Sequence, residues 1–256
     1  MMRFKFACLL TVPVLAVMSQ SARANRIAYE GFSLTFPAYN TDAGFSGPWA
    51  QGGFEVTASG YAAGEGSLFY LNGNGNAGAK ENSGDAGLLV GGGSISDATS
   101  SVINGAKRPL AQSLGADNTT VYFSFLIRPQ GTLNSGVLNG FFGLTLNGSL
   151  GNDLFIGKPG GGVDTQYVPE TRGGGGQIPS GTSAVVDQTA LLVVKAQFLN
   201  GHDIFTLYAN PVPGDSEPTS GAFESDLDLG VVSAVGIYST ADLPSMKSES
   251  ARLLPT

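Results

Sequence analysis

The chain has 256 residues, of which 42 % are hydrophobic and 13 % are charged, and it contains a single histidine and a single cysteine. Its formal net charge of −7 argues against nucleic acid or an anionic membrane surface as a partner, because both repel an acidic protein. One histidine and one cysteine also argue against zinc sites and catalytic centres that need several such residues.

The first 24 residues have the layout of a secretory signal peptide. Arg3 and Lys5 precede an apolar run over residues 7–18, and a small-x-small cleavage site ends at Ala24. The apolar run is too short to span a bilayer. The only cysteine, Cys8, lies in this segment, so the mature chain has no disulfide. We therefore expect an exported protein with no membrane span in its mature part.

Three features in the first half of the mature chain are interpreted as structural. Trp49, the only tryptophan, could stack on a sugar ring, but we expect it to anchor a core. The stretch "GNGNAG", residues 73–78, matches a dinucleotide fingerprint, but the glycines after it prevent the helix that such a site needs. Residues 101–114 form the only helix-like patch, and Gly105 and Pro109 keep it short.

The rest of the chain has the pattern of short strands between glycine-rich turns, in keeping with its 38 glycines. Residues 120–129, "TVYFSFLIRP", predict a strand that a proline ends. Residues 140–148 and 153–162 predict a hairpin around Asn147 and the glycine after it. Residues 228–239 predict one more strand.

The stretch from Gly151 to Lys158 resembles a phosphate loop only superficially. Its spacing is wrong for that motif, and Pro159 replaces the Ser or Thr that would hold magnesium. We interpret it as a turn.

Residues 190–211, "ALLVVKAQFLNGHDIFTLYANP", contain the only histidine, His202, with Asp203 beside it. Apolar and polar residues alternate before the Asn-Gly pair at 200–201, and a second β-prone run follows it, which predicts an antiparallel hairpin. A catalytic histidine needs a pocket and an orienting partner. His202 follows the turn, so we expect it to be exposed and idle.

Glu224, Asp226 and Asp228 are the one acidic group that merits attention. On a strand they would share one face, which is how paired carboxylates serve a glycosidase. Three interpretations stay open for them: a solvated strand face, which we favour, a calcium site, and a catalytic set.

About a dozen short strands indicate one all-β domain, a two-sheet antiparallel jelly-roll sandwich over residues 25–242. The mature chain contains, in this order, "YEGF", "GFSGPW", "GSLFY", "YFSFLIRP", "FFGLTLNG", "FIGKPGGG", "LLVVKAQF" and "LGVVSAVGIYS". In these motifs it resembles a family, the exported LamG-like, concanavalin A-like jelly-roll proteins of bacteria that carry PEP-CTERM sorting signals. The resemblance implies that fold and a place at the bacterial cell surface, and it offers no catalytic residues to transfer.

The tail departs from that family. Its members end in a strand resembling "IDEIRIG" and an anchor, whereas residues 243–256, "LPSMKSESARLLPT", show no alternation. A back-translation of this stretch reads "TIDEIRIGTTSAD" in another frame. We therefore hypothesise a frameshift near Asp242, which predicts a poorly packed tail and an unpaired edge on a neighbouring strand. Codons incompatible with this reading would end the hypothesis.

For function, we expect a non-enzymatic, lectin-like domain at the cell surface or in the extracellular matrix, with a polysaccharide as its partner. We predict no catalytic residue and no cofactor, with calcium as the one alternative, and leave the ligand-binding residues and oligomeric state open. One alternative is a carbohydrate-active hydrolase or lyase that uses Glu224, Asp226 and Asp228 in a groove. The other is a purely structural adhesion or coat module.

Overall fold

The computed structural model describes residues 27–28, 44–51, 61–64, 94–97, 103–129, 133, 140–161, 163, 165–171, 176–186, 188–212, 215–240 and 247–255. The predicted signal peptide, residues 1–24, and the "GNGNAG" stretch lie outside these ranges. Within them every regular element is a strand, and no helix is present that could cross a membrane. The strands are β1 (Ala50–Gln51), β2 (Tyr61–Gly64), β3 (Ser94–Asp97), β4 (Ile103–Leu114), β5 (Thr119–Arg128), β6 (Phe142–Gly148), β7 (Asp153–Lys158), β8 (Val168–Thr171), β9 (Ala190–Phe198), β10 (Ile204–Ala209), β11 (Ala222–Glu224), β12 (Val232–Thr240) and β13 (Lys247–Pro255).

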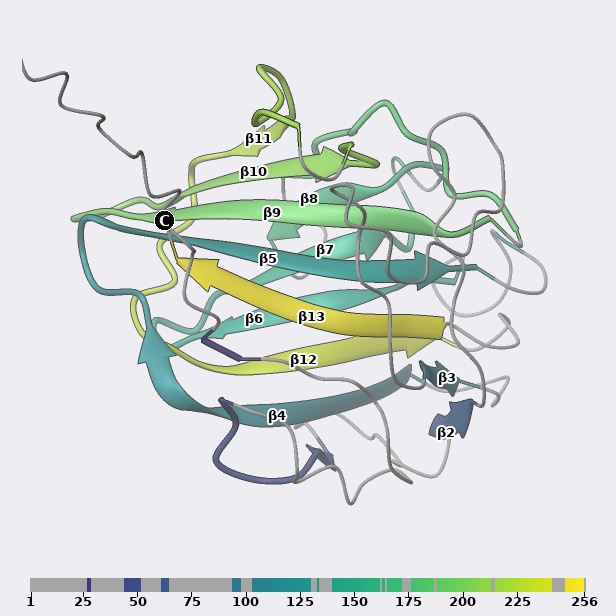
Figure 1. Cartoon of the computed structure of the whole chain (residues 1–256), viewed down its shortest axis with the longest axis horizontal. Coiled ribbons are helices and arrows are strands. Elements are labelled where there is room, and N and C mark those ends of the chain that lie inside the picture. The colour runs from purple at the N-terminus through teal and green to yellow at the C-terminus, as the bar shows by residue number, and fades with distance from the viewer. Residues whose placement is uncertain are drawn as a thin grey trace, which may run out of the picture.

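These strands form two antiparallel sheets (Figure 1). One sheet has six strands in the order β1-β4-β12-β6-β7-β8, and the other has seven in the order β11-β10-β9-β5-β13-β3-β2. Among the described strands the chain changes sheet seven times: between β1 and β2, β3 and β4, β4 and β5, β5 and β6, β8 and β9, β11 and β12, and β12 and β13. Such exchange of strands between two layers is typical of the jelly-roll sandwich, so the predicted fold class is confirmed.

Apolar side chains at every second position of the strands build the core between the sheets. In β5, Val121, Phe123 and Phe125 are almost fully buried, whereas Tyr122 and Ser124 between them are partly exposed. This period of two follows from the pleat, which sends successive side chains to opposite faces. Trp49 is 3 % exposed and belongs to the core cluster, as predicted.

Both predicted hairpins are present. β9 and β10 pair antiparallel, and Gly201 in their turn has a φ of 101°. β6 and β7 also pair, but Asn147 still lies opposite Asp153, so the turn follows at residues 149–152 with Gly151 at a φ of 82°. The Asn-Gly pair predicted as this turn therefore belongs to the strand.

The helix-like patch is wrong, because residues 103–114 form the strand β4. Ala106 and Leu110 are buried in the core and alternate with the partly exposed Lys107 and the exposed Pro109. Pro109 lies where the register with β12 is irregular, so its missing N–H is tolerated. Pairing with β12 over residues 103–109 and at Leu114 decides the conformation.

The predicted unpaired edge beside the tail is also wrong. β13 lies between β5 and β3 and pairs with both, so β5 is paired along both of its edges. Backbone hydrogen bonds need no alternation of side chains, which is why a tail without a strand pattern still fits there. Its pairing with β5 is irregular between Glu249 and Arg252. The frameshift hypothesis stays a prediction about the DNA sequence.

Candidate binding face on the seven-stranded sheet

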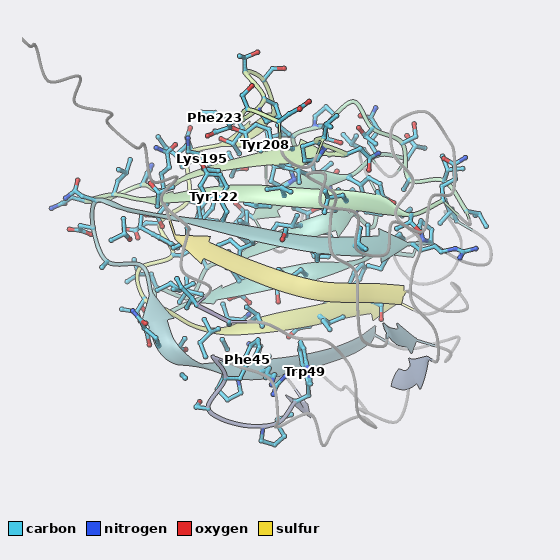
Figure 2. The ribbon with its side chains drawn as sticks, viewed as in Figure 1. Phe45, Trp49, Tyr122, Lys195, Tyr208 and Phe223 are labelled. Atoms are coloured by element: carbon cyan, nitrogen blue, oxygen red, sulfur yellow. The ribbon has the colours of Figure 1, made fainter. Side chains whose placement is uncertain are left out.

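Four side chains form a row across the outer face of the seven-stranded sheet. Phe223 of β11 pairs with Thr206 of β10, and Thr206 pairs in turn with Lys195 of β9. Lys195 then pairs with Tyr122 of β5. These positions alternate with core residues, and the labelled side chains lie over neighbouring strands (Figure 2). Neighbouring strands are about 4.8 Å apart, so the row spans about 14 Å.

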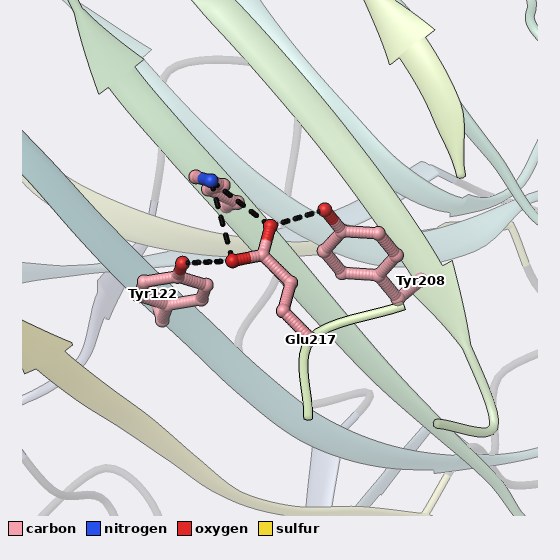
Figure 3. Close-up of polar contacts among 4 residues, drawn as sticks. Tyr122, Tyr208 and Glu217 are labelled. Atoms are coloured by element: carbon pink, nitrogen blue, oxygen red, sulfur yellow. Dashed lines mark hydrogen bonds and ion pairs between the residues drawn. The ribbon is translucent and has the colours of Figure 1, made fainter. Parts of the chain in front are cut away.

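Three donors on this face hold one carboxylate, that of Glu217 (Figure 3). The Tyr122 hydroxyl donates to Glu217 Oε2 at 2.8 Å, and the Tyr208 hydroxyl donates to Oε1 at 2.6 Å. Lys195 Nζ lies 2.9 Å from Oε1 and 3.3 Å from Oε2. We call Tyr122, Lys195 and Tyr208 the carboxylate cradle. Both oxygens of the Glu217 carboxylate therefore accept hydrogen bonds from the cradle.

Glu217 reaches the cradle from the segment 210–221, which connects β10 to β11. Asn210 fixes the start of this segment, because its N–H donates to Leu191 O at 2.7 Å and its Oδ1 accepts from Leu191 N at 2.9 Å. Gly221 fixes the end, where a Cβ would lie 2.7 Å from Leu207 O. Between these two ends, the side chain of Glu217 attaches the segment to the cradle.

The contacts between the cradle and Glu217 shift the pKa values of both. Hydrogen bonds from Tyr208, Lys195 and Tyr122, against an opposing effect of burial, lower the pKa of Glu217 to about 2. The hydrogen bond to Glu217 raises the pKa of Lys195, while burial and the same carboxylate raise the pKa of Tyr208. At neutral pH the face therefore holds an ionised carboxylate, an ammonium group and two neutral hydroxyl donors.

The sheet by itself makes this part of the face cationic. Among the outward positions of β5, β9, β10 and β11, the charged side chains are Arg128 and Lys195, and both are basic. The remaining outward positions carry hydroxyl, amide, aliphatic or aromatic groups. In a chain of net charge −7, the acid on this face comes from the connecting segment and not from these strands.

The row combines groups that suit a flat, hydroxylated ligand. Phe223, at the outward position of β11, is 49 % exposed. Tyr122 offers a partly exposed ring, and Lys195 and Glu217 offer charged hydrogen-bonding groups whose side chains are 23 % and 39 % exposed. Such a face can stack on a ring and bind hydroxyl groups without moving its own backbone.

His202 lies exposed on the surface beside the turn, as predicted. Its neighbour Asp203 is 2 % exposed and joins two loops, because its carboxylate accepts from Leu199 N at 3.1 Å and from Leu229 N at 3.0 Å. Burial raises the pKa of Asp203, and these backbone donors oppose that rise. Asp203 therefore connects the β9–β10 turn to the segment before β12.

Glu224, Asp226 and Asp228 do not share a strand face, so this prediction is wrong. β11 ends at Glu224, which is 3 % exposed and faces the interior, while Asp226 lies exposed in the bend that follows. The Asp228 Oδ1 accepts from Gly230 N at 2.8 Å and closes a local turn. The described residues bring no three acidic or histidine side chains together as a metal site.

The stretch from Gly151 to Lys158 is not a phosphate loop. It runs from the β6–β7 turn through the whole of β7, so only its first residues belong to a turn. Lys158 is fully buried and donates to the carbonyl oxygens of Gly140 and Pro159. Its ammonium group is therefore turned to the chain's own backbone.

The candidate face includes residues that the sequence patterns did not single out, namely Tyr122, Lys195, Tyr208, Glu217 and Phe223. A usable signal was present for Lys195, a charged residue in the apolar run "LLVVKAQF". Alternation places it on the solvent face of its strand. No local pattern marks Glu217, which lies 95 residues after Tyr122.

Comparison with known proteins gives no family. No family model matches the chain, and no curated protein matches it in sequence. Solved structures similar to it include the carbohydrate recognition domain of Emp47p, at 11 % identity and a TM-score of 0.40, covering 93 % of this chain and 99 % of that one. An endo-1,3-beta-glucanase from Streptomyces sioyaensis covers 88 % of each chain at 8 % identity and a TM-score of 0.41. An alginate lyase from Corynebacterium sp. covers 64 % of this chain and 76 % of its own at 10 % identity and a TM-score of 0.42.

Proposed function

We propose that this protein is an exported, non-enzymatic carbohydrate-binding domain of the LamG-like type, and that the outer face of β11, β10, β9 and β5 is its binding surface. The observation that carries the proposal is the row from Phe223 to Tyr122. It has one aromatic ring at each end, with Thr206 and Lys195 between them. The export part of the proposal rests on the signal-peptide pattern of residues 1–24.

The row fits a saccharide for three reasons. An exposed aromatic ring can cover the apolar face of a pyranose while its edge stays in contact with water. The Thr206 hydroxyl and the Lys195 ammonium group lie between the rings, where sugar hydroxyls need partners. The rings stand on paired strands, so binding orders few side chains and little backbone.

The proposal is tested by measuring the binding of laminarin, xylan and polygalacturonate, with and without calcium, by titration calorimetry. Tyr122→Ala and Phe223→Ala each remove one ring, and we expect each to weaken binding at least about tenfold, the loss expected for a contact worth about 1.4 kcal/mol. Val231→Ala is the matched control, since Val231 is also 49 % exposed but lies outside the row.

Two results would contradict the proposal. One is that the folded protein binds none of the three polysaccharides under either condition. The other is that binding is found but survives both ring substitutions unchanged, which would place the binding surface elsewhere on the molecule.

A further inference from the structure

The carboxylate cradle and its occupant come from different parts of the chain. The donors Tyr122, Lys195 and Tyr208 stand on three consecutive paired strands, whose spacing the sheet fixes. Glu217 comes from the segment 210–221, and its side chain is 39 % exposed. The three donors are thus fixed by the sheet, whereas Glu217 reaches them from a connecting segment through its partly exposed side chain.

The donor set matches a carboxylate in particular. Oε1 accepts from Tyr208 at 2.6 Å and from Lys195 at 2.9 Å, and Oε2 accepts from Tyr122 at 2.8 Å. Three donors thus converge on the two oxygens of one planar group, and one of them is charged, which makes these hydrogen bonds strong. A neutral sugar hydroxyl could use one or two of these donors but would leave Lys195 without its counter-charge.

We propose that the cradle is a carboxylate receptor occupied by the chain's own Glu217, and that its external ligand is the carboxylate of a uronic acid residue in an acidic polysaccharide. The inference rests on the proposed function and names the saccharide class for the same face. Thr206 and Phe223, in register beside Lys195, place a hydroxyl partner and an exposed ring next to the cradle. A uronate ring offers the face and the hydroxyl groups that these two can use, and a peptide carboxylate does not.

Glu217 then acts as a built-in competitor. It is tethered, so it faces the cradle at an effective concentration on the order of millimolar. If it fills the cradle 90–99 % of the time, the apparent affinity for an external carboxylate falls by about 10- to 100-fold. Removing its charge should therefore strengthen the binding of a uronate polymer, whereas removing a contact that helps binding would weaken it.

The test compares polygalacturonate with the same polymer after its carboxyl groups have been reduced to alcohols. Glu217→Gln should bind polygalacturonate at least about tenfold more tightly than the natural chain, with an advantage that declines as salt is raised. The carboxyl-reduced polymer should show no such gain. Adding Lys195→Met to Glu217→Gln should abolish the gain, because the cradle then lacks its cation.

Asp215→Asn is the matched control, because it removes one negative charge from the same exposed segment without a contact to the cradle. An equal gain in Asp215→Asn would show a general charge effect and overturn the inference. Circular dichroism spectra confirm that each variant is folded, and Glu217→Ala repeats the test with the side chain removed.

The outcomes separate this inference from the proposed function. If both polymers bind, Tyr122→Ala and Phe223→Ala weaken both, and Glu217→Gln changes neither, the face binds saccharides but Glu217 only attaches its segment, and the inference fails alone. If no polymer binds any variant and free galacturonate causes no NMR shift in the Tyr122 or Tyr208 ring, both proposals fail. If Glu217→Gln gains binding only to poly-glutamate, the receptor is for peptides and the saccharide assignment is wrong.

Discussion

Replacing Glu224 by glutamine removes a carboxyl group that the folded chain holds at the end of β11. The Glu224 side chain is 3 % exposed, and its Oε1 accepts from Ser225 N at 3.1 Å and from Asp226 N at 3.3 Å. Its Oε2 is buried and has no hydrogen-bond partner among the described residues, and Gly176 packs against it so closely that a Cβ there would lie 2.6 Å away. Burial and the neighbouring Asp226 raise the pKa of Glu224 to about 7.

The raised pKa of Glu224 determines how the stability of the fold changes with pH. The unfolded chain ionises Glu224 near 4.5, whereas the folded chain keeps it protonated up to about 7. The protonated form thus stabilises the fold fully below 4.5, and this stabilisation is lost as the pH rises to about 7. The shift corresponds to about 3 kcal/mol, which solvent next to the exposed Asp226 reduces to about 1–2 kcal/mol.

The assay is urea unfolding of the natural chain and of Glu224→Gln at pH 5 and at pH 8. The difference in the free energy of unfolding, variant minus natural, should rise by about 1–2 kcal/mol between the two pH values, because glutamine has no charge to bury. Asp215→Asn, a substitution at an exposed carboxylate, should show a difference that stays nearly constant. A constant difference for Glu224→Gln would refute the buried, protonated state of this side chain.

Three further substitutions test the framework of the fold and the site. Gly157→Ala should cost more than about 3 kcal/mol in urea unfolding, because the new Cβ would lie 2.2 Å from Phe142 O, and a normal yield with unchanged stability would contradict this close approach of the two strands. Asp203→Ala should cost about 2–4 kcal/mol by leaving two backbone N–H groups without their acceptor, and a thermal melt within one degree of the natural chain would exclude that role. His202→Ala should change stability by less than about 0.5 kcal/mol and leave saccharide binding unchanged, so a clear loss of binding would make this histidine part of the binding surface.

The strands that are predicted best from the sequence are those in which apolar and polar residues alternate. β5 and β9 alternate buried and partly exposed residues over "TVYFSF" and "LVVKAQF", because there each strand has one face in the core and one toward solvent. A glycine with positive φ closes the turn between β9 and β10, and an Asn-Gly pair marks it. The two strands of this hairpin lie within residues 190–209, so local chemistry is enough.

Prediction fails where a distant partner decides the structure. The sequence of β4 lacks a clear alternation of apolar and polar residues and contains Pro109. Its sequence pattern alone therefore does not distinguish a strand from a short helix. Its conformation depends on β12, which lies more than 100 residues later in the chain. The β6–β7 turn shows the same limit on a smaller scale, since cross-strand pairing keeps Asn147 in the strand although an Asn-Gly pair favours a turn.

The site is less predictable than the fold, because its geometry joins four separate segments. Lys195 and Tyr122 become neighbours only through the β5–β9 register, and Glu217 joins them from a segment with no strand pattern. The acidic residues that did stand out, Glu224 and Asp226, are separated by the end of a strand that is only three residues long. Spacing in sequence gives a common face only while the strand continues.

The acidic composition and a carboxylate receptor are compatible because charge acts over different distances for different ligands. At physiological salt, exposed charges more than about 8 Å apart are largely screened, so a single carboxylate in the cradle interacts mainly with Lys195. A nucleic acid or an anionic membrane covers a wide surface and meets the net charge of −7 as a whole. Uronate binding should therefore depend on Lys195 itself, and Lys195→Arg, which keeps the charge but changes the donor geometry, should retain more of it than Lys195→Met. Equal loss in both variants would show that the shape of the cradle, and not its charge, selects the ligand.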